Sequence, residues 1–413
     1  MPLVMETSIV DRVVLGERDR FHAGCLEIDA GALRTALETA SQAIQKVTLH
    51  EVSPGDAARI HCCKDVIAPG LKLDGETPGS GRRRVLENLA VVSCGPIVGF
   101  QEGIIDMSGP GADYTPFSKL LLLAIEMETV AGVTPHEHEA ALRNAGLQAA
   151  EYVTRICAQR APDRCETVFW DERTVAEDLP RIAYVCMVLS QGLLHDTWVL
   201  GRNAGEGLPK VLDPRVFLDG GVISGNCVSA SDKNTSFHHA NNPVVKLLLA
   251  GHGVRWNFVG TVITNQPIRL ADKEKSARDA ASMVIDFNAN GAIVTKEGFG
   301  NPDSDFMMIL RLLGEAGIGC VGVSDEFAGS SGGSQSLADV TSLADAIVST
   351  GNANQKVLLP ALERVIGPVP DIERLAGGYA GSIKSDGSLE VELQAIMGAT
   401  NELGFSYLSA TEV

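Results

Sequence analysis

The order of apolar and polar positions is most regular in the C-terminal half of the chain. Short apolar runs typical of buried strands alternate there with longer segments of helical periodicity. The expected strands are residues 256–263, 292–295, 320–324 and 346–349, and the expected helices are 273–287, 303–315 and 337–344. This alternation predicts a parallel sheet wrapped by helices, which is a doubly wound α/β domain.

The N-terminal half has a β-rich pattern with one long helix. Apolar or alternating runs predict strands at 44–51, 57–67 and 89–93. Residues 69–84 are rich in glycine and charge, which predicts a loop; its three arginines at 82–84 are either solvated or a phosphate site. Thr134 followed by Pro135 predicts a helix over 134–159. We therefore expect an α/β fold, with a β-rich α+β N-terminal part before the doubly wound domain.

Polar residues follow the strands expected in the C-terminal half. These side chains are Asn265, Glu297, Asp325, Glu326 and Asn352. Ligands of open parallel sheets bind beyond the carboxyl ends of the strands, so this set predicts a pocket for a small amine or carboxylate substrate. The same residue types also make turns and helix caps, and that interpretation stays open. His195, beside Asp196, is a separate candidate acid or base, or a histidine satisfied at a strand end.

A single cysteine, Cys227, follows a Gly-Asn turn near the middle of the chain. Its sulfur can attack the carbonyl carbon of Asn226 and turn the amide into a thioester. A thiolate, a strained peptide and a donor for the oxyanion favour this step, and Gly225 allows such strain. His238 and His239 lie shortly downstream, and either could serve as the base. Taken alone, the tripeptide also fits an inert buried thiol.

Composition limits the possible partners and cofactors. The 413 residues carry a net charge of −18 with a pI of about 4.9, so nucleic acid and anionic membranes would repel the protein. The first residues lack a secretory signal pattern, and no apolar run approaches the ~20 residues of a membrane span, so we expect a cytoplasmic protein. Nine cysteines without zinc-ligand spacing predict reduced thiols and no metal. No GxGxxG motif supports a nicotinamide or flavin cofactor.

Unusual motifs along nearly the whole chain point to one family. They occupy residues 99–112, 114–118, 190–197, 220–234, 262–265, 270–274, 297–303, 334–339, 350–354 and 398–405. With these motifs the chain resembles the proprotein subunit of component B of the glycine/sarcosine/betaine reductases. The family usually has a second acid before Glu297, where this chain has Lys296, and often a cysteine where Ser231 stands. Lys296 could alter substrate choice or partner docking.

The resemblance implies a self-cleaving proprotein with an α+β N-terminal chain, 1–226, and an α/β C-terminal chain, 227–413, that stay associated. Cys227 would become a pyruvoyl group that forms a Schiff base with the substrate amine (glycine, sarcosine, betaine or a related amino acid) before reductive C–N cleavage. The attacking selenol or thiol would come from a selenocysteine- or cysteine-bearing component B subunit, and a small selenoprotein would carry the product. The alternatives are a pyruvoyl-dependent decarboxylase and an uncleaved structural homologue.

Overall fold

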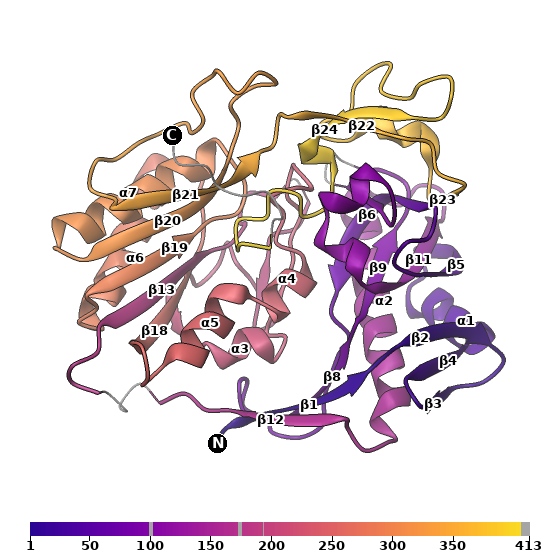
Figure 1. Cartoon of the computed structure of the whole chain (residues 1–413), viewed down its shortest axis with the longest axis horizontal. Coiled ribbons are helices and arrows are strands. Elements are labelled where there is room, and N and C mark those ends of the chain that lie inside the picture. The colour runs from indigo at the N-terminus through magenta and orange to yellow at the C-terminus, as the bar shows by residue number, and fades with distance from the viewer. Residues whose placement is uncertain (99–101, 172–175, 193, 406–413) are drawn as a thin grey trace.

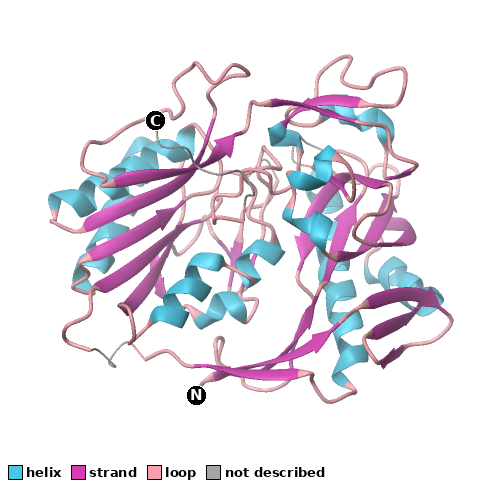
Figure 2. Cartoon of the chain, in the orientation of Figure 1, coloured by secondary structure: helices cyan, strands magenta, loops and turns pink. Residues whose placement is uncertain are grey.

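The computed structural model describes residues 1–98, 102–171, 176–192 and 194–405. Two lobes lie side by side, and each is built on a six-stranded sheet (Figure 1). Helices cover these sheets, while loops occupy much of the region between the lobes (Figure 2). Residues 99–101 and 193 of the family motifs lie outside the described residues. The architecture is α/β, as the sequence predicts.

The first lobe contains a mixed sheet in the order β10-β6-β9-β11-β5, with β23 paired to β6. Its strands are β5 (Ile44–Val52), β6 (Ala58–Ile67), β9 (Leu89–Cys94), β10 (Gly103–Asp106), β11 (Leu121–Thr129) and β23 (Arg364–Ile366). The three strands predicted in this region are confirmed. β6 and β9 are buried along their whole length because both faces of the sheet are covered by apolar clusters.

Helix α2 (Pro135–Ala158) covers one face of this sheet, and its start is fixed by a capping box. Glu137 N donates to the Thr134 hydroxyl, while Thr134 N donates to the Glu137 carboxylate at 3.0 Å. The helix predicted over 134–159 is therefore confirmed. Its buried residues, such as Leu142 and Val153, pack on the sheet.

A four-stranded sheet in the order β12-β1-β8-β7 runs along the base of the molecule (Figure 1). Its strands are β1 (Leu3–Ile9), β7 (Gly70–Lys72), β8 (Gly81–Glu87) and β12 (Arg164–Val168). The loop predicted over 69–84 is wrong for 70–72 and 81–84, which belong to strands. Arg84 is buried and pairs with Glu6 at 2.8 Å, because a buried guanidinium needs a carboxylate partner.

The second lobe contains a sheet in the order β16-β18-β13-β19-β20-β21, parallel except for β16. Its strands are β13 (Arg181–Met187), β16 (Lys210–Leu212), β18 (Asn257–Thr264), β19 (Gly291–Thr295), β20 (Gly319–Glu326) and β21 (Ala346–Asn352). Helices α6 (Leu270–Asp286) and α7 (Asn301–Glu315) pack on one face, and α3 (Arg215–Leu218) and α5 (Pro243–Gly251) pack on the other. The predicted doubly wound domain is confirmed.

The helix predicted over 337–344 is wrong, because this segment forms bends and turns. Its backbone donors are taken by side chains instead of helical carbonyls. Ala338 N donates to Asp303 Oδ2 at 2.9 Å, and Val340 N donates to Asp339 Oδ1 at 2.8 Å. Such side-chain acceptors compete directly with the helical hydrogen-bond pattern.

The strand order creates a topological switch point between β13 and β19. From β13 the chain passes through β16 to β18 on one side, and then through α6 to β19 on the other side. Ligands of doubly wound sheets bind at the carboxyl ends of the strands beside such a point. Glu297 follows β19, and Asp325 lies near the end of β20, so both are positioned at this edge.

Both large sheets combine strands from before and after Cys227. β13 and β16 precede Cys227 but pair with β18 and β19, which follow it. β23 follows Cys227 but pairs with β6 of the first lobe. The two lobes therefore do not coincide with the segments 1–226 and 227–413.

Smaller elements complete the described fold. They are β2 (Arg12–Gly16), β3 (Arg20–His22), β4 (Cys25–Asp29), α1 (Ala30–Ala40), η1 (Pro110–Asp113), η2 (Pro116–Lys119), β14 (Trp198–Val199), β15 (Arg202–Asn203), β17 (Val222–Ile223), α4 (Ser236–Ala240), β22 (Lys356–Leu359), η3 (Val369–Arg374), β24 (Leu389–Glu392) and η4 (Leu393–Ala395). Within the described ranges, no helix has both the length and the apolar character needed to cross a membrane.

Candidate functional site

Cys227 lies in a buried segment, after β17, that contacts both lobes. Lys233 Nζ donates to Lys64 O of the first lobe at 2.6 Å. Asn234 N donates to Glu297 Oε1 of the second lobe at 2.9 Å. Cys227 itself is only 2% exposed, so its thiol is enclosed where the lobes meet.

Gly225 is required by close packing. A Cβ at this position would lie 2.4 Å from Thr197 N and 2.5 Å from the carbonyl carbon of Asp196. The φ angle of Gly225 is outside the left-handed region. Glycine here therefore allows the chain to approach the loop after β13, and the strain expected from the sequence is not seen in its φ angle.

The same loop positions the peptide bond that precedes Cys227. Asn226 N donates to the backbone carbonyl of His195 at 2.9 Å. A Cβ on Gly192 would lie 2.8 Å from Asn226 O, so this glycine allows the loop to pack against the carbonyl that a cysteine sulfur would attack. Asn226 is buried.

The Cys227 thiol is protonated in this environment. Burial raises its pKa well above the ordinary value, and the carboxyl groups of Asp232 and Glu297 raise it further. A hydrogen bond from the Ser229 backbone acts in the opposite direction but is outweighed. A thiolate favours the attack on Asn226 that the sequence predicts, but burial disfavours the thiolate here. Nucleophilic attack by this sulfur therefore requires a base. Cys227 Sγ donates to Asp232 Oδ1 at 3.4 Å.

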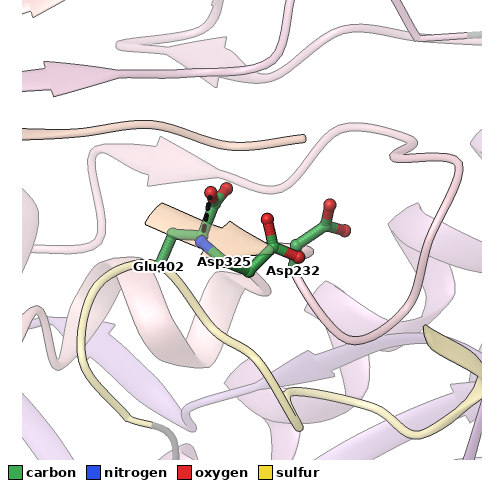
Figure 3. A group of neighbouring side chains, drawn as sticks. All are labelled: Asp232, Asp325 and Glu402. Carbon is green, nitrogen blue, oxygen red and sulfur yellow. Dashed lines mark hydrogen bonds between the residues drawn. The ribbon is translucent and has the colours of Figure 1, made fainter. Parts of the chain in front are cut away.

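Three fully buried carboxyl groups gather beside this thiol. They belong to Asp232, Asp325 and Glu402, and Figure 3 shows them side by side on separate segments of the chain. Asp325 N donates to Glu402 Oε1 at 3.1 Å, which fixes the position of the Glu402 side chain. Asp325 Oδ2 accepts a hydrogen bond from Thr400 at 3.2 Å. The cluster therefore joins the end of β20 to the segment after η4.

Lys296 supplies the positive charge of this cluster. Its Nζ is fully buried and lies 2.8 Å from Glu402 Oε1, 2.9 Å from Asp303 Oδ1 and 3.7 Å from Asp325 Oδ1. Burial alone would lower its pKa, but these three carboxylates outweigh burial and raise it above the ordinary value. The residue that departs from the family pattern is thus a buried ammonium group with several anionic partners.

The carboxyl groups hold protons more strongly than exposed ones do. Burial raises the pKa of Asp325 to about 6. Burial also raises the pKa of Asp232 well above its ordinary value, with a further contribution from Asp325, and raises that of Glu402 in the same way. These neighbouring carboxyl groups around one lysine therefore influence one another's titration.

Glu297 is a separate buried carboxylate at the switch point. Its Oε2 accepts from Leu189 N at 3.1 Å, after β13, and its Oε1 accepts from Asn234 N. Burial raises its pKa to about 7, against the opposing effect of these two hydrogen bonds. Glu297 also contributes to the raised pKa of Cys227. The structure thus places this predicted residue in the surroundings of the thiol.

His238 and His239 are fully buried on α4. His238 Nδ1 lies 3.2 Å from both Thr235 N and Asn401 Nδ2, and its ring packs 5.0 Å from the Phe117 ring centre. Burial lowers the pKa of both imidazoles to about 3. Their role as the base stays a prediction, and the contact found at Cys227 Sγ is with Asp232.

The backbone of His195 contacts Asn226, while its imidazole ring contacts side chains of helix α2. Its Nδ1 pairs with Glu139 of α2, and its ring packs edge-on against His136. Its carbonyl oxygen accepts the hydrogen bond from Asn226 N. Its catalytic role stays a prediction.

The remaining predicted substrate residues accept hydrogen bonds from other segments of the second lobe. Glu326 accepts from the hydroxyls of Ser336 and Ser349. Asn352 Oδ1 accepts from Ala328 N at 3.2 Å, and Asn265 Oδ1 accepts from the Ser276 hydroxyl at 2.7 Å. A substrate role for the three stays a prediction.

Sequence reasoning missed Asp232, Glu402 and the role of Lys296. Asp232 lies within the family motif at 220–234, and Glu402 lies within the motif at 398–405. Neither residue follows a predicted strand. One oxygen from each of Asp232, Asp325 and Glu402 lies within 4.8 Å of the others, a spacing that can hold a metal ion. The Lys296 ammonium lies 2.8 Å from Glu402 Oε1 and 3.7 Å from Asp325 Oδ1, so a positive charge is already present beside two of these three groups.

Fold and site together define an α/β protein in which an enclosed thiol, near the middle of the chain, lies beside a group of buried carboxyl side chains. The chain belongs to the family described as glycine/sarcosine/betaine reductase component B subunits, which matches residues 1–411. It is therefore a subunit of a reductase.

Curated relatives agree with this assignment. The glycine reductase complex component B subunits alpha and beta of Peptoclostridium acidaminophilum are 44% identical, over 99% of both sequences. The sarcosine reductase complex component B subunit alpha of the same organism is 40% identical, again over 99% of both. The D-proline reductase proprotein PrdA of Acetoanaerobium sticklandii is 22% identical, over 76% of this chain and 53% of its own length. No solved structure matches the chain significantly.

Proposed function

We propose that this chain is a self-processing proprotein subunit of an amino-acid reductase, cut between Asn226 and Cys227. The observation that carries the proposal is the enclosed Cys227 thiol, 3.4 Å from Asp232 at the ligand-binding edge of the sheet. One relative that aligns over 99% of its length is named as two subunits, alpha and beta, and another is named a proprotein. These names support the proposal that one polypeptide is cut into two subunits.

The surroundings of Cys227 fit a pyruvoyl group formed from this residue. Gly298 leaves space beside the sulfur, since even a Cβ there would remain 3.8 Å from Sγ. Asp232 Oδ2 is buried without a hydrogen-bond partner among the described residues, and so is Asn226 Oδ1. These two oxygens are available to groups bound at this place. A pyruvoyl group supplies an electrophilic ketone for covalent attachment of a substrate amine.

The charges around the site favour a small cationic amine as the substrate. Glu297, Asp232 and Asp325 are all buried acids near this edge of the sheet. They attract an ammonium group and can accept the proton that it must lose before its nitrogen attacks a ketone. Glycine and sarcosine meet this requirement, whereas the quaternary nitrogen of betaine carries no proton to lose and cannot attach in this way.

The reducing nucleophile comes from a partner. We propose a component B subunit that supplies a selenol or thiol, and a small selenoprotein that accepts the product, in the cytoplasm. Burial raises the pKa of the Cys62 and Cys94 thiols, so neither of these cysteines is a ready nucleophile. A pyruvoyl-dependent decarboxylase, which needs no thiol partner, would instead release carbon dioxide as an isolated protein.

The intact mass of the denatured protein, with and without a hydrazide, tests the proposal. Scaling 43.6 kDa by chain length gives pieces of roughly 24 and 20 kDa. We expect both pieces, with the hydrazide attached only to the smaller one. A single chain of full mass that retains the Cys227 thiol contradicts cleavage, and Cys227→Ala provides the uncut reference.

A further inference from the structure

Asp232 is the acidic side chain that contacts the Cys227 thiol. The Sγ-to-Oδ1 distance is 3.4 Å, and both side chains are buried. The second carboxyl oxygen, Oδ2, has no hydrogen-bond partner among the described residues. The carboxyl group is therefore free to accept the sulfur proton without giving up another hydrogen bond.

The groups around Asp232 make it a stronger base than an exposed aspartate. Burial raises its pKa well above the ordinary value, the nearby Asp325 raises it further, and Lys296 acts in the opposite direction. The charge of Glu297 also raises the pKa of Asp232. A carboxylate whose proton affinity is increased in this way is better matched to a thiol than an ordinary one.

The two histidines are less suited to this role. His238 Nδ1 already lies within hydrogen-bond distance of Thr235 N and Asn401 Nδ2. Burial and the neighbouring Lys233 lower the pKa of His239 to about 3. An imidazole that binds a proton this weakly is a poor acceptor for a thiol proton at neutral pH.

We propose that Asp232 is the catalytic base, and then the catalytic acid, of the acyl shift that begins the chain cleavage on which the proposed function rests. Asp232 takes the proton from Sγ as the sulfur attacks the carbonyl carbon of Asn226. The bond between this carbon and the Cys227 nitrogen then breaks, and Asp232 returns the same proton to that nitrogen. The products are a thioester and a free amine, so the step consumes no other reactant.

Full-length chains made by cell-free synthesis, followed by intact mass over time, test this assignment. We expect the wild-type chain to form two pieces and Asp232→Asn to stay whole, with cleavage slowed at least about 100-fold, the usual contribution of a general base. Asp305→Asn is the matched control, because Asp305 is also buried but pairs with Lys273. It should be cleaved at the wild-type rate.

Hydroxylamine provides a second readout, because it cuts thioesters. It should release the N-terminal piece from the wild-type chain early in the time course but not from Asp232→Asn. Circular dichroism checks that the variants fold, and Asp232→Ser replaces Asp232→Asn if the latter does not. Cleavage of the folded Asp232 variant at the wild-type rate overturns the role of Asp232 and leaves the proposed function intact. A wild-type chain that stays whole overturns both.

Discussion

Lys296 Nζ lies 2.8 Å from Glu402 Oε1, and both side chains are completely buried. This contact joins the segment after β19 to a segment near the C-terminal end of the described chain. Glu402 also accepts from Asp325 N, so one carboxylate links a lysine and a strand end. The lysine thereby fixes the geometry of the acids that lie next to Cys227.

Replacing Lys296 with Met should destabilise the protein strongly. The substitution leaves buried carboxylates without their cation, which costs about 3 to 5 kcal/mol in comparable cases. The loss should be smaller at low pH, where the acids bind protons. Urea unfolding at pH 8 measures it, and the exposed Lys275→Met should change stability by less than about 1 kcal/mol. Equal effects of the two substitutions would contradict this account.

The unfolding free energy should fall as pH rises from 4.5 to 7, in part because of Glu297. Its pKa is about 7 in the folded state and 4.5 as the reference value, so the folded protein binds more protons across this range. The contribution is present in full below pH 4.5 and is lost by about pH 7, for a total of about 3 kcal/mol. Glu297→Gln should flatten the slope in urea titrations. An unchanged slope would show that Glu297 does not titrate there; the exposed Glu363→Gln is the control.

Gly225→Ala should disturb the peptide bond that precedes Cys227. The new Cβ would meet Thr197 N at 2.4 Å, so the segment must shift, at a cost of about 1 to 3 kcal/mol. We expect uncut chain to accumulate in the intact-mass experiment. Gly31→Ala in α1 is the control, because its Cβ would meet no atom closer than 3.4 Å and alanine favours a helix. Normal cleavage of Gly225→Ala would show that this packing does not position the bond.

The two pieces formed by cleavage should remain one particle. β13 lies between β18 and β19 in the sheet, and β23 lies against β6, so each piece completes a sheet of the other. Size-exclusion chromatography should give one peak that contains both pieces, at the volume of the uncut Cys227→Ala chain. Only denaturant should separate them. Separate peaks in native buffer would show that these strand pairs do not hold the pieces together.

Much of the fold can be predicted because its signals are local. Apolar runs located β18, β19 and β20, and helical periodicity located α6 and α7. The helix expected over 337–344 was wrong because its donors find tertiary acceptors, such as Asp303 for Ala338 N. The sequence of the segment itself gives no sign that a carboxylate of helix α7 will accept its backbone hydrogen bond.

The site could be predicted only in part, because local sequence patterns do not show tertiary contacts. Cys227 has a local motif, and Glu297 and Asp325 follow strands that the sequence predicts, so the sequence indicates them. Glu402 comes to Lys296 from a distant part of the chain. Asp232 is only five residues from Cys227, but their contact depends on the path of a buried segment without regular secondary structure. These relationships depend on tertiary structure, which local sequence patterns do not encode.

The sharing of strands across Cys227 also sets an order of events during biosynthesis. The loop that contacts Asn226 follows β13, and Glu297 follows β19, so the surroundings of the thiol exist only after strands from both halves have paired. Under the proposed cleavage, a nascent or misfolded chain that lacks these surroundings would keep its backbone intact. A chain break at Asn226 would then be a permanent record that the molecule had reached its native state, which gives a cell a covalent checkpoint for assembly.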